Sequence, residues 1–223
     1  MKIDIAVCGM EGTGKTTTVK LLESLLMEAG YSPRRVPFMQ LPFNHFTSPH
    51  RWMARSAKRA VAFKEGTEMS QYDDNLRALL NVKPSHLSIL YVVVFVFRVL
   101  AFRVFFAFRS HKRAVIFARY FYDNIAHKTV RSRRQRILES LMLAMTPKPK
   151  MLFFLNAPAD TIVVRRPRIS RENVLTLLAR YKALGDRLDE VVTLDTTRGV
   201  VLLESDLRDH LRRYLCQYDG CQV

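Results

Sequence analysis

Residues 2–30, KIDIAVCGMEGTGKTTTVKLLESLLMEAG, decide the fold class of this chain. The apolar and β-branched residues at the start of this stretch end at Gly9, which predicts a buried strand over 2–8. Beyond a glycine-rich loop, apolar residues such as Val19, Leu22 and Leu26 recur at helical spacing. They predict a helix over 15–29, and Gly30 is a natural helix stop. A strand, a loop and a helix in this order indicate an α/β protein.

The loop GMEGTGKT, residues 9–16, matches the pattern G-x-x-x-x-G-K-[ST] at every fixed position. Its glycines let backbone N–H groups approach phosphate oxygens, because no Cβ stands in the way. Lys15 is placed to reach the outer phosphates, and the Thr16 hydroxyl to join the Mg²⁺ shell. The sequence therefore predicts a site for ATP and Mg²⁺, with Thr16 as the metal ligand. The predicted binding residues are Gly9, Met10, Glu11, Gly12, Thr13, Gly14, Lys15, Thr16 and Thr17.

Strand and helix patterns alternate along the rest of the chain. Further strands are predicted over 35–39, 112–118, 151–157 and 191–196, and further helices over 87–109, 124–145 and 203–215. Residues 41–85 read as a loop followed by helical pieces. We expect a five-stranded parallel sheet covered by helices on both faces, a three-layer α/β/α fold, in one domain over 1–223.

The charge balance is strongly basic, with 36 Lys and Arg against 20 Asp and Glu, a net charge of +16. Such an excess favours polyanionic partners: nucleotide phosphates, an anionic membrane surface or, as the least favoured of the three, nucleic acid. Cys8, Cys216 and Cys221 show no disulfide or metal-ligand spacing, and the histidines show none either. We expect a reduced, cytoplasmic protein.

The most apolar segment, 87–109, is interrupted by three arginines. Its uninterrupted part is too short to span a bilayer, for which about 20 apolar residues are needed. We interpret it as a core helix or a subunit-interface helix of a homodimer, with peripheral membrane contact as the alternative.

Two further stretches carry groups suited to phosphate chemistry. VIFARYFYDN, 115–124, places Arg119 at the carboxyl end of a predicted strand, where open α/β sheets bind their ligands. VVRRPRISR, 163–171, concentrates arginines near Pro158 and Pro167, as a closing lid would. Arginines on a lid supply positive charge to a transferring phosphoryl group. A solvated basic helix face is the alternative interpretation of that cluster.

The loop, the strand ending in Arg119-Tyr120 and the arginine cluster together resemble the thymidylate kinase family of nucleoside monophosphate kinases. The resemblance implies transfer of the γ-phosphoryl group of ATP to a nucleoside monophosphate, with Arg119 on the acceptor phosphate. Family loops carry an acidic residue at the position of Glu11. Because position 12 is glycine and not arginine, the chain is similar to the subtype whose catalytic arginine lies in the lid. The lid is expected around 158–175, with Arg165, Arg166 and Arg168 as the candidates.

Ala118 departs from that family, which has aspartate before the arginine. A methyl group neither ligates a metal nor accepts a proton. Three explanations stay open: Asp123 or Glu11 supplies the carboxylate, the acceptor differs, or phosphoryl transfer is impaired.

The leading functional hypothesis is an ATP-dependent kinase acting on a small phosphorylated acceptor, with Lys15, Arg119 and the lid arginines as its catalytic residues. The alternatives are a kinase of a sugar or other non-nucleotide acceptor, and a nucleotide-binding module with impaired catalysis.

Overall fold

The computed structural model describes residues 3–36, 87–107, 113–127, 130 and 132–219. Their elements are β1 (Ile3–Cys8), α1 (Lys15–Glu28), β2 (Ser32–Val36), α4 (Leu87–Ala107), β3 (Arg113–Phe117), α5 (Phe121–Ala126), α6 (Arg133–Met145), β4 (Met151–Asn156), α7 (Ala159–Arg165), α8 (Arg171–Gly185), β5 (Val191–Asp195) and α9 (Val200–Asp219). The predicted loop and helical pieces over 41–85 lie outside the described residues.

The five strands form one parallel sheet in the order β2-β3-β1-β4-β5. The β1 strand therefore lies in the centre, and its carboxyl end leads directly into the phosphate loop. The strand order reverses direction at β1, and ligands of open α/β sheets bind beside such a switch. The expected five-stranded parallel sheet is confirmed.

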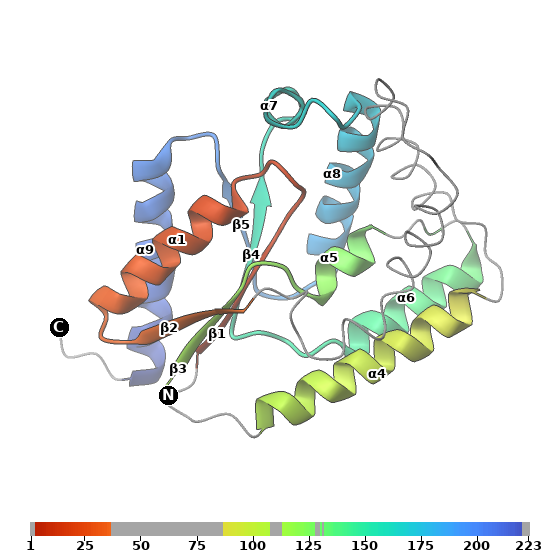
Figure 1. Ribbon diagram of the computed structural model, residues 1–223, viewed down its shortest axis with the longest axis horizontal. Coiled ribbons are helices and arrows are strands. Elements are labelled where there is room, and N and C mark those ends of the chain that lie inside the picture. Colours follow the sequence, from red (N-terminus) through yellow and green to blue (C-terminus); the bar gives the residue numbers. More distant parts are fainter. Residues whose placement is uncertain (1–2, 37–86, 108–112, 128–129, 131, 220–223) are drawn as a thin grey trace, which may run out of the picture.

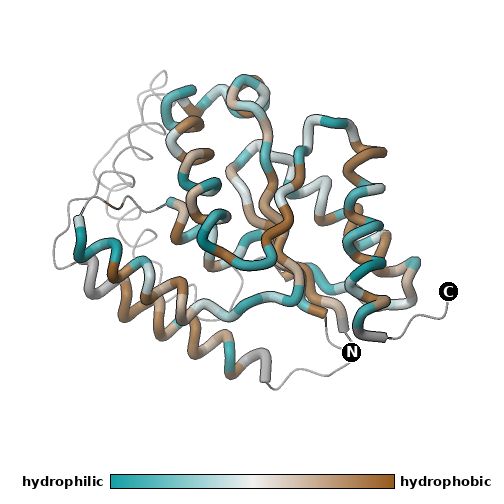
Figure 2. Tube along the Cα trace, turned by 180° about the vertical axis from the view of Figure 1, so that it is seen from behind, coloured by the Kyte–Doolittle hydropathy of each residue, from teal (hydrophilic) through white to brown (hydrophobic). Residues whose placement is uncertain are grey.

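Alternate residues of the central strands face two separate apolar layers. Ile3, Ile5 and Val7 pack with α1 and α9, whereas Ala6 and Cys8 pack with α4, α5, α6 and α8. Figure 1 shows α1 and α9 on one side of the sheet and α5 and α8 on the other. In Figure 2 the strands between these layers are apolar over most of their length, while α9 alternates between apolar and polar. The expected three-layer fold is confirmed.

The prediction for the second strand was wrong at its start, because β2 begins at Ser32 and contains Pro33. Because β2 is an edge strand that pairs only with β3, it tolerates a proline.

The prediction of a single helix over 124–145 was also wrong. Helix α5 ends at Ala126, and α6 starts at Arg133 behind its own N-cap. The Ser132 hydroxyl accepts the Gln135 N–H at 3.3 Å, and the Ser132 N–H donates to the Gln135 side chain at 3.0 Å. Ser132 and Gln135 form a capping box, a sequence pattern that indicates the start of a helix. The last helix is longer than predicted and spans Val200–Asp219.

Helix α4 packs one face against the core. Phe95 and Phe102 are buried, and the Phe102 ring contacts Phe117, Tyr120 and Phe121 at centroid distances of 5.4–5.8 Å. The core-helix interpretation is confirmed for this face; a homodimer interface and membrane contact stay predictions. Within the described part of the chain, no helix has both the length and the apolar character required to cross a bilayer.

Candidate active site

The loop between β1 and α1 has a backbone that only glycine accommodates. Gly9 has a φ of 152°, and a Cβ there would lie 2.8 Å from the Thr13 Oγ1 and 3.0 Å from the Leu155 backbone oxygen. Gly12 has a φ of 92°, and its Cβ would lie 3.1 Å from the Arg166 Cγ. The glycines therefore allow the loop to press against β4 on one side and the lid on the other.

Internal hydrogen bonds give the loop its shape. The buried Thr13 hydroxyl donates to the Met10 backbone oxygen at 2.7 Å. The Lys15 Nζ donates to the Gly9 and Met10 backbone oxygens at 2.6 and 2.7 Å, so the ammonium group folds back over the loop. Burial lowers the pKa of Lys15 from its ordinary value, and the negative charge of Asp123 opposes that shift.

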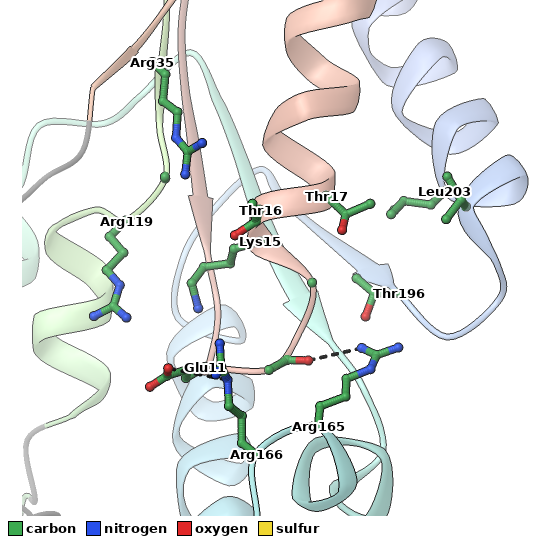
Figure 3. A pocket seen from close by; sticks show the side chains of 14 residues that line it. Glu11, Lys15, Thr16, Thr17, Arg35, Arg119, Arg165, Arg166, Thr196 and Leu203 are labelled. Carbon is green, nitrogen blue, oxygen red and sulfur yellow. Dashed lines mark hydrogen bonds and ion pairs between the residues drawn. The ribbon is translucent and has the colours of Figure 1, made fainter.

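A cavity of about 770 Å³ opens around the loop, and Figure 3 shows the side chains that line it. They come from the loop, from the carboxyl ends of β2, β3 and β5, from α7 and from the start of α9. The lining residues are Glu11, Gly12, Gly14, Lys15, Thr16, Thr17, Arg35, Ala118, Arg119, Arg165, Arg166, Thr196, Val200 and Leu203.

The structure brings most of the predicted site residues to this cavity. Gly9, Met10 and Thr13 are not among the lining residues; they are buried beneath it and shape the loop. Of the lid candidates, Arg165 and Arg166 line the cavity, whereas Arg168 is exposed outside it. The catalytic role of Arg168 stays a prediction.

The lid arginines contact acceptor groups of the loop itself. Arg165 donates to the Gly12 backbone oxygen at 3.1 Å, drawn as a dashed line in Figure 3. The Arg166 Nε lies 3.5 Å from the Glu11 carboxylate, and both side chains are about half exposed. The positive charge at the end of α7 is therefore directed at the loop.

Sequence reasoning missed Arg35, which lies at the carboxyl end of β2. Arg35 lies on β2 and Arg119 follows the neighbouring strand β3, and Figure 3 shows both on the same side of Lys15. The signal that located Arg119, an arginine at a strand end, applies equally to Arg35. We overlooked this signal because the strand was predicted over 35–39, which put Arg35 at its start and not near its carboxyl end.

A second set of lining residues that the sequence analysis missed lies on the other side of Lys15. Thr196 follows β5, and Val200 and Leu203 lie in the first turns of α9. Val200 and Leu203 give that half of the cavity an apolar wall, and Figure 3 shows Leu203 beside Thr17.

Asp123 does not line the cavity. The Asp123 side chain is 6% exposed and accepts hydrogen bonds from the Gly9 N–H, the Tyr120 N–H and the Tyr181 hydroxyl at 3.1, 2.8 and 2.6 Å. In this arrangement three donors engage its carboxylate outside the cavity. Glu11 does line the cavity, on the loop and paired with Arg166.

A magnesium ion has one natural ligand in this site. The Thr16 side chain is exposed in the cavity at the first turn of α1. The described residues contain no group of three or more His, Cys, Asp and Glu side chains that would hold a metal. Thr16 and the oxygens of a bound triphosphate therefore fit a Mg²⁺ ion that arrives with its nucleotide.

Comparisons with known proteins agree with this geometry. No protein-family model matches the chain. A probable thymidylate kinase of Archaeoglobus fulgidus is 23% identical over 216 residues, which cover 95% of each chain. The chain is similar to a thymidylate kinase over nearly its whole length. A solved thymidylate kinase structure from Candida albicans matches with a TM-score of 0.59 at 13% identity, over 95% of this chain and 92% of the other.

The structural match and the strand order identify a three-layer α/β/α fold of the P-loop NTPase type. The likeness supports a nucleotide kinase function for the chain.

Proposed function

We propose that the protein is a nucleoside monophosphate kinase that transfers the γ-phosphoryl group of ATP to a dTMP-like acceptor. The observation that carries this proposal is the cavity around the phosphate loop and its charge. Its lining includes five basic side chains, Lys15, Arg35, Arg119, Arg165 and Arg166, and one carboxylate, Glu11. This excess of positive charge suits two phosphorylated substrates bound side by side.

The two halves of the cavity suit different substrates. The loop amides and the start of α1 fit the triphosphate of ATP, and the apolar wall of Val200 and Leu203 fits its base. Arg35 and Arg119 fit the acceptor phosphate, because a guanidinium group binds phosphate through paired N–H donors. When bound, Mg²⁺ would neutralise charge on the triphosphate oxygens.

In the proposed reaction, an oxygen of the acceptor phosphate attacks the γ-phosphorus. The bond from that phosphorus to the β,γ-bridging oxygen breaks, and ADP leaves with the bonding electron pair. Arg165 and Arg166 would neutralise charge on the transferring group once they release Gly12 and Glu11.

This chemistry is compatible with Ala118. The second pKa of a phosphate monoester is about 6, so at neutral pH the attacking oxygen is already deprotonated and needs no general base. A sugar hydroxyl would need one, and the one carboxylate among the residues that line the cavity, Glu11, is paired with Arg166. The cavity therefore favours a phosphorylated acceptor over the sugar alternative.

Steady-state ADP formation tests the proposal. We expect ADP release from ATP and Mg²⁺ that depends on a monophosphate, highest with dTMP in a panel of nucleoside monophosphates, and none above background with thymidine. ADP formed with thymidine but not with dTMP would contradict it. Tight ATP binding without any acceptor-dependent ADP would favour a nucleotide-binding module instead.

A further inference from the structure

Asp123 connects three parts of the fold beneath the phosphate loop. It is the third residue of α5, and its carboxylate is almost completely buried. Oδ1 accepts the Gly9 N–H at 3.1 Å and the Tyr181 hydroxyl at 2.6 Å, and Oδ2 accepts the Tyr120 N–H at 2.8 Å. The donors belong to the phosphate loop, to helix α8 and to the segment after β3.

A carboxylate suits this position because an ionised carboxylate only accepts hydrogen bonds. Three donors converge on it, and bonds from donors to a buried charged acceptor are shorter and stronger than bonds between neutral groups. An asparagine of the same size would have to turn its NH₂ group toward at least one of these donors. The site therefore discriminates between two side chains of nearly equal volume.

The hydrogen bonds continue to the lysine of the loop. Tyr181 donates to Asp123, the Gly9 N–H donates to the same oxygen, and the Lys15 Nζ donates to the Gly9 backbone oxygen. Both backbone polar groups of Gly9, its N–H and its C=O, are thereby hydrogen-bonded.

Helix α8 extends this connection to the lid. Arg171, at the first position of α8, lies 2.8 Å from Asp160 in α7, and α7 ends in the lid arginine Arg165. Tyr181 lies on the buried face of the same helix, and α5 lies beside α8 in Figure 1.

We propose that Asp123 is a positioning residue that fixes the phosphate loop and links it to the lid through Tyr181 and helix α8. The inference rests on the proposed function only in taking a triphosphate as the ligand of that loop. It also explains why the carboxylate closest in sequence to Ala118 stands outside the cavity.

Amide hydrogen exchange of the ligand-free protein tests the loop contact. In Asp123→Asn we expect peptides covering residues 9–16 to exchange faster than in the wild type. Tyr181→Phe, which removes only the hydroxyl, should give a smaller change of the same sign in these peptides.

Tyr120→Phe is the matched control, because it also deletes one buried tyrosine hydroxyl bond, to the Pro147 backbone oxygen at 2.9 Å. That bond does not involve the loop, so loop exchange should stay as in the wild type. Loop exchange in Asp123→Asn equal to that in Tyr120→Phe would overturn the proposal. Melting curves of all variants show whether a change reflects global unfolding.

Calorimetric binding of ATP with Mg²⁺ tests the consequence for the ligand. Loss of bonds to a buried charged group predicts a Kd about tenfold higher in Asp123→Asn, and a Kd only a few-fold higher in Tyr181→Phe. In the double variant the Tyr181 hydroxyl, one of the donors that face the asparagine side chain, is absent. The rise in its Kd should therefore be smaller than the product of the two single rises.

Single effects that simply multiply in the double variant would contradict the link through Tyr181. A wild-type protein that does not bind ATP would refute the proposed function but not the exchange result, so the two failures are distinguishable.

Discussion

Ala118 and Arg119 directly follow β3 and both line the cavity, but only Arg119 carries a charge. The neighbouring strand adds Arg35, so the acceptor half of the cavity has two guanidinium groups. A carboxylate at position 118 would compete with the acceptor for these groups.

Replacing Ala118 tests this at a single residue. In Ala118→Asp the added negative charge should raise the KM for the acceptor monophosphate about tenfold, by repulsion of the phosphate. Ala118→Asn, of nearly the same size and uncharged, should change it little. Initial rates of ADP formation at varied acceptor concentration measure both. A large gain in kcat for Ala118→Asp, at an unchanged KM, would show instead that the natural chain is catalytically impaired.

His127 makes the stability of the fold depend on pH. The His127 Nδ1 lies 2.6 Å from the Asp123 backbone oxygen and must carry the proton, because a carbonyl only accepts. Burial lowers the pKa of His127 and outweighs the opposite effect of this hydrogen bond. The folded state therefore disfavours the protonated ring. The contribution of His127 to the unfolding free energy should be fully present above the unfolded-state pKa of about 6.5. It should be lost as the pH falls below that value.

Urea unfolding between about pH 7.5 and about pH 5 measures this effect. His127→Gln should lose less unfolding free energy over that interval than the wild type. An equal loss in both proteins would contradict the assignment.

At the residue scale, the sequence was sufficient to predict which side chains line the cavity where a motif or a strand end identifies them. Lys15, Thr16 and Arg119 were located in this way. The bond between Tyr181 and Asp123 was not predictable, because it joins residues 58 positions apart that only the packed fold brings together.

Among the elements, α7 carries the arginines of the lid. Arg165 and Arg166 line the cavity at the end of that helix, whereas Arg168 lies beyond it. Removing a preorganised donor to developing charge reduces kcat far more than it weakens ground-state binding.

We therefore expect Arg165→Gln and Arg166→Gln each to lower kcat about 100-fold or more, while the Kd for ATP changes less. Arg168→Gln should have a smaller effect on kcat. Single-turnover rates with saturating substrates measure the difference. A larger loss in Arg168→Gln than in both other variants would reverse the assignment.

Helix α4 contributes to stability through one face only. Phe102 is 4% exposed within a cluster of aromatic rings, whereas Leu100 is 56% exposed on the same helix. Phe102→Ala should lower the unfolding free energy by about 3–5 kcal/mol. Leu100→Ala should lower it by about 0.5 kcal/mol or less, and denaturant unfolding measures both. Equal losses would mean that the outer face of α4 is also covered.

At the element scale, hydrophobic periodicity located the strands and long helices to within a few residues. It failed between α5 and α6, because residues 127–136 contain one apolar residue, Val130, and so give no periodicity to interpret. The Ser132 capping box, a local polar signal, marked the second start.

On the scale of the whole molecule, the strand order places the carboxyl ends of β1 and β3 side by side. The phosphate loop and Arg119 thereby share one cavity. Alternating strands and helices predicted parallel strands and covered faces, but they did not predict the order of the strands, since periodicity does not specify neighbours. The division into one domain and the lid boundaries at 158–175 stay predictions.

The basic charge of the chain is partly explained by this arrangement. Five of the basic side chains converge on one cavity from four separate segments of the sequence. Net charge alone predicted polyanionic partners, and the fold concentrates this charge where phosphates would bind.

The most direct test of the account is calorimetric binding of ATP with Mg²⁺ to three proteins: the wild type, Lys15→Ala and Lys20→Ala. Lys20 is an exposed lysine on the same helix, α1, and does not line the cavity. We predict saturable binding to the wild type and to Lys20→Ala, and none detectable to Lys15→Ala. Equal affinity of all three proteins, or no binding to the wild type, would contradict the central claim that this loop holds a triphosphate.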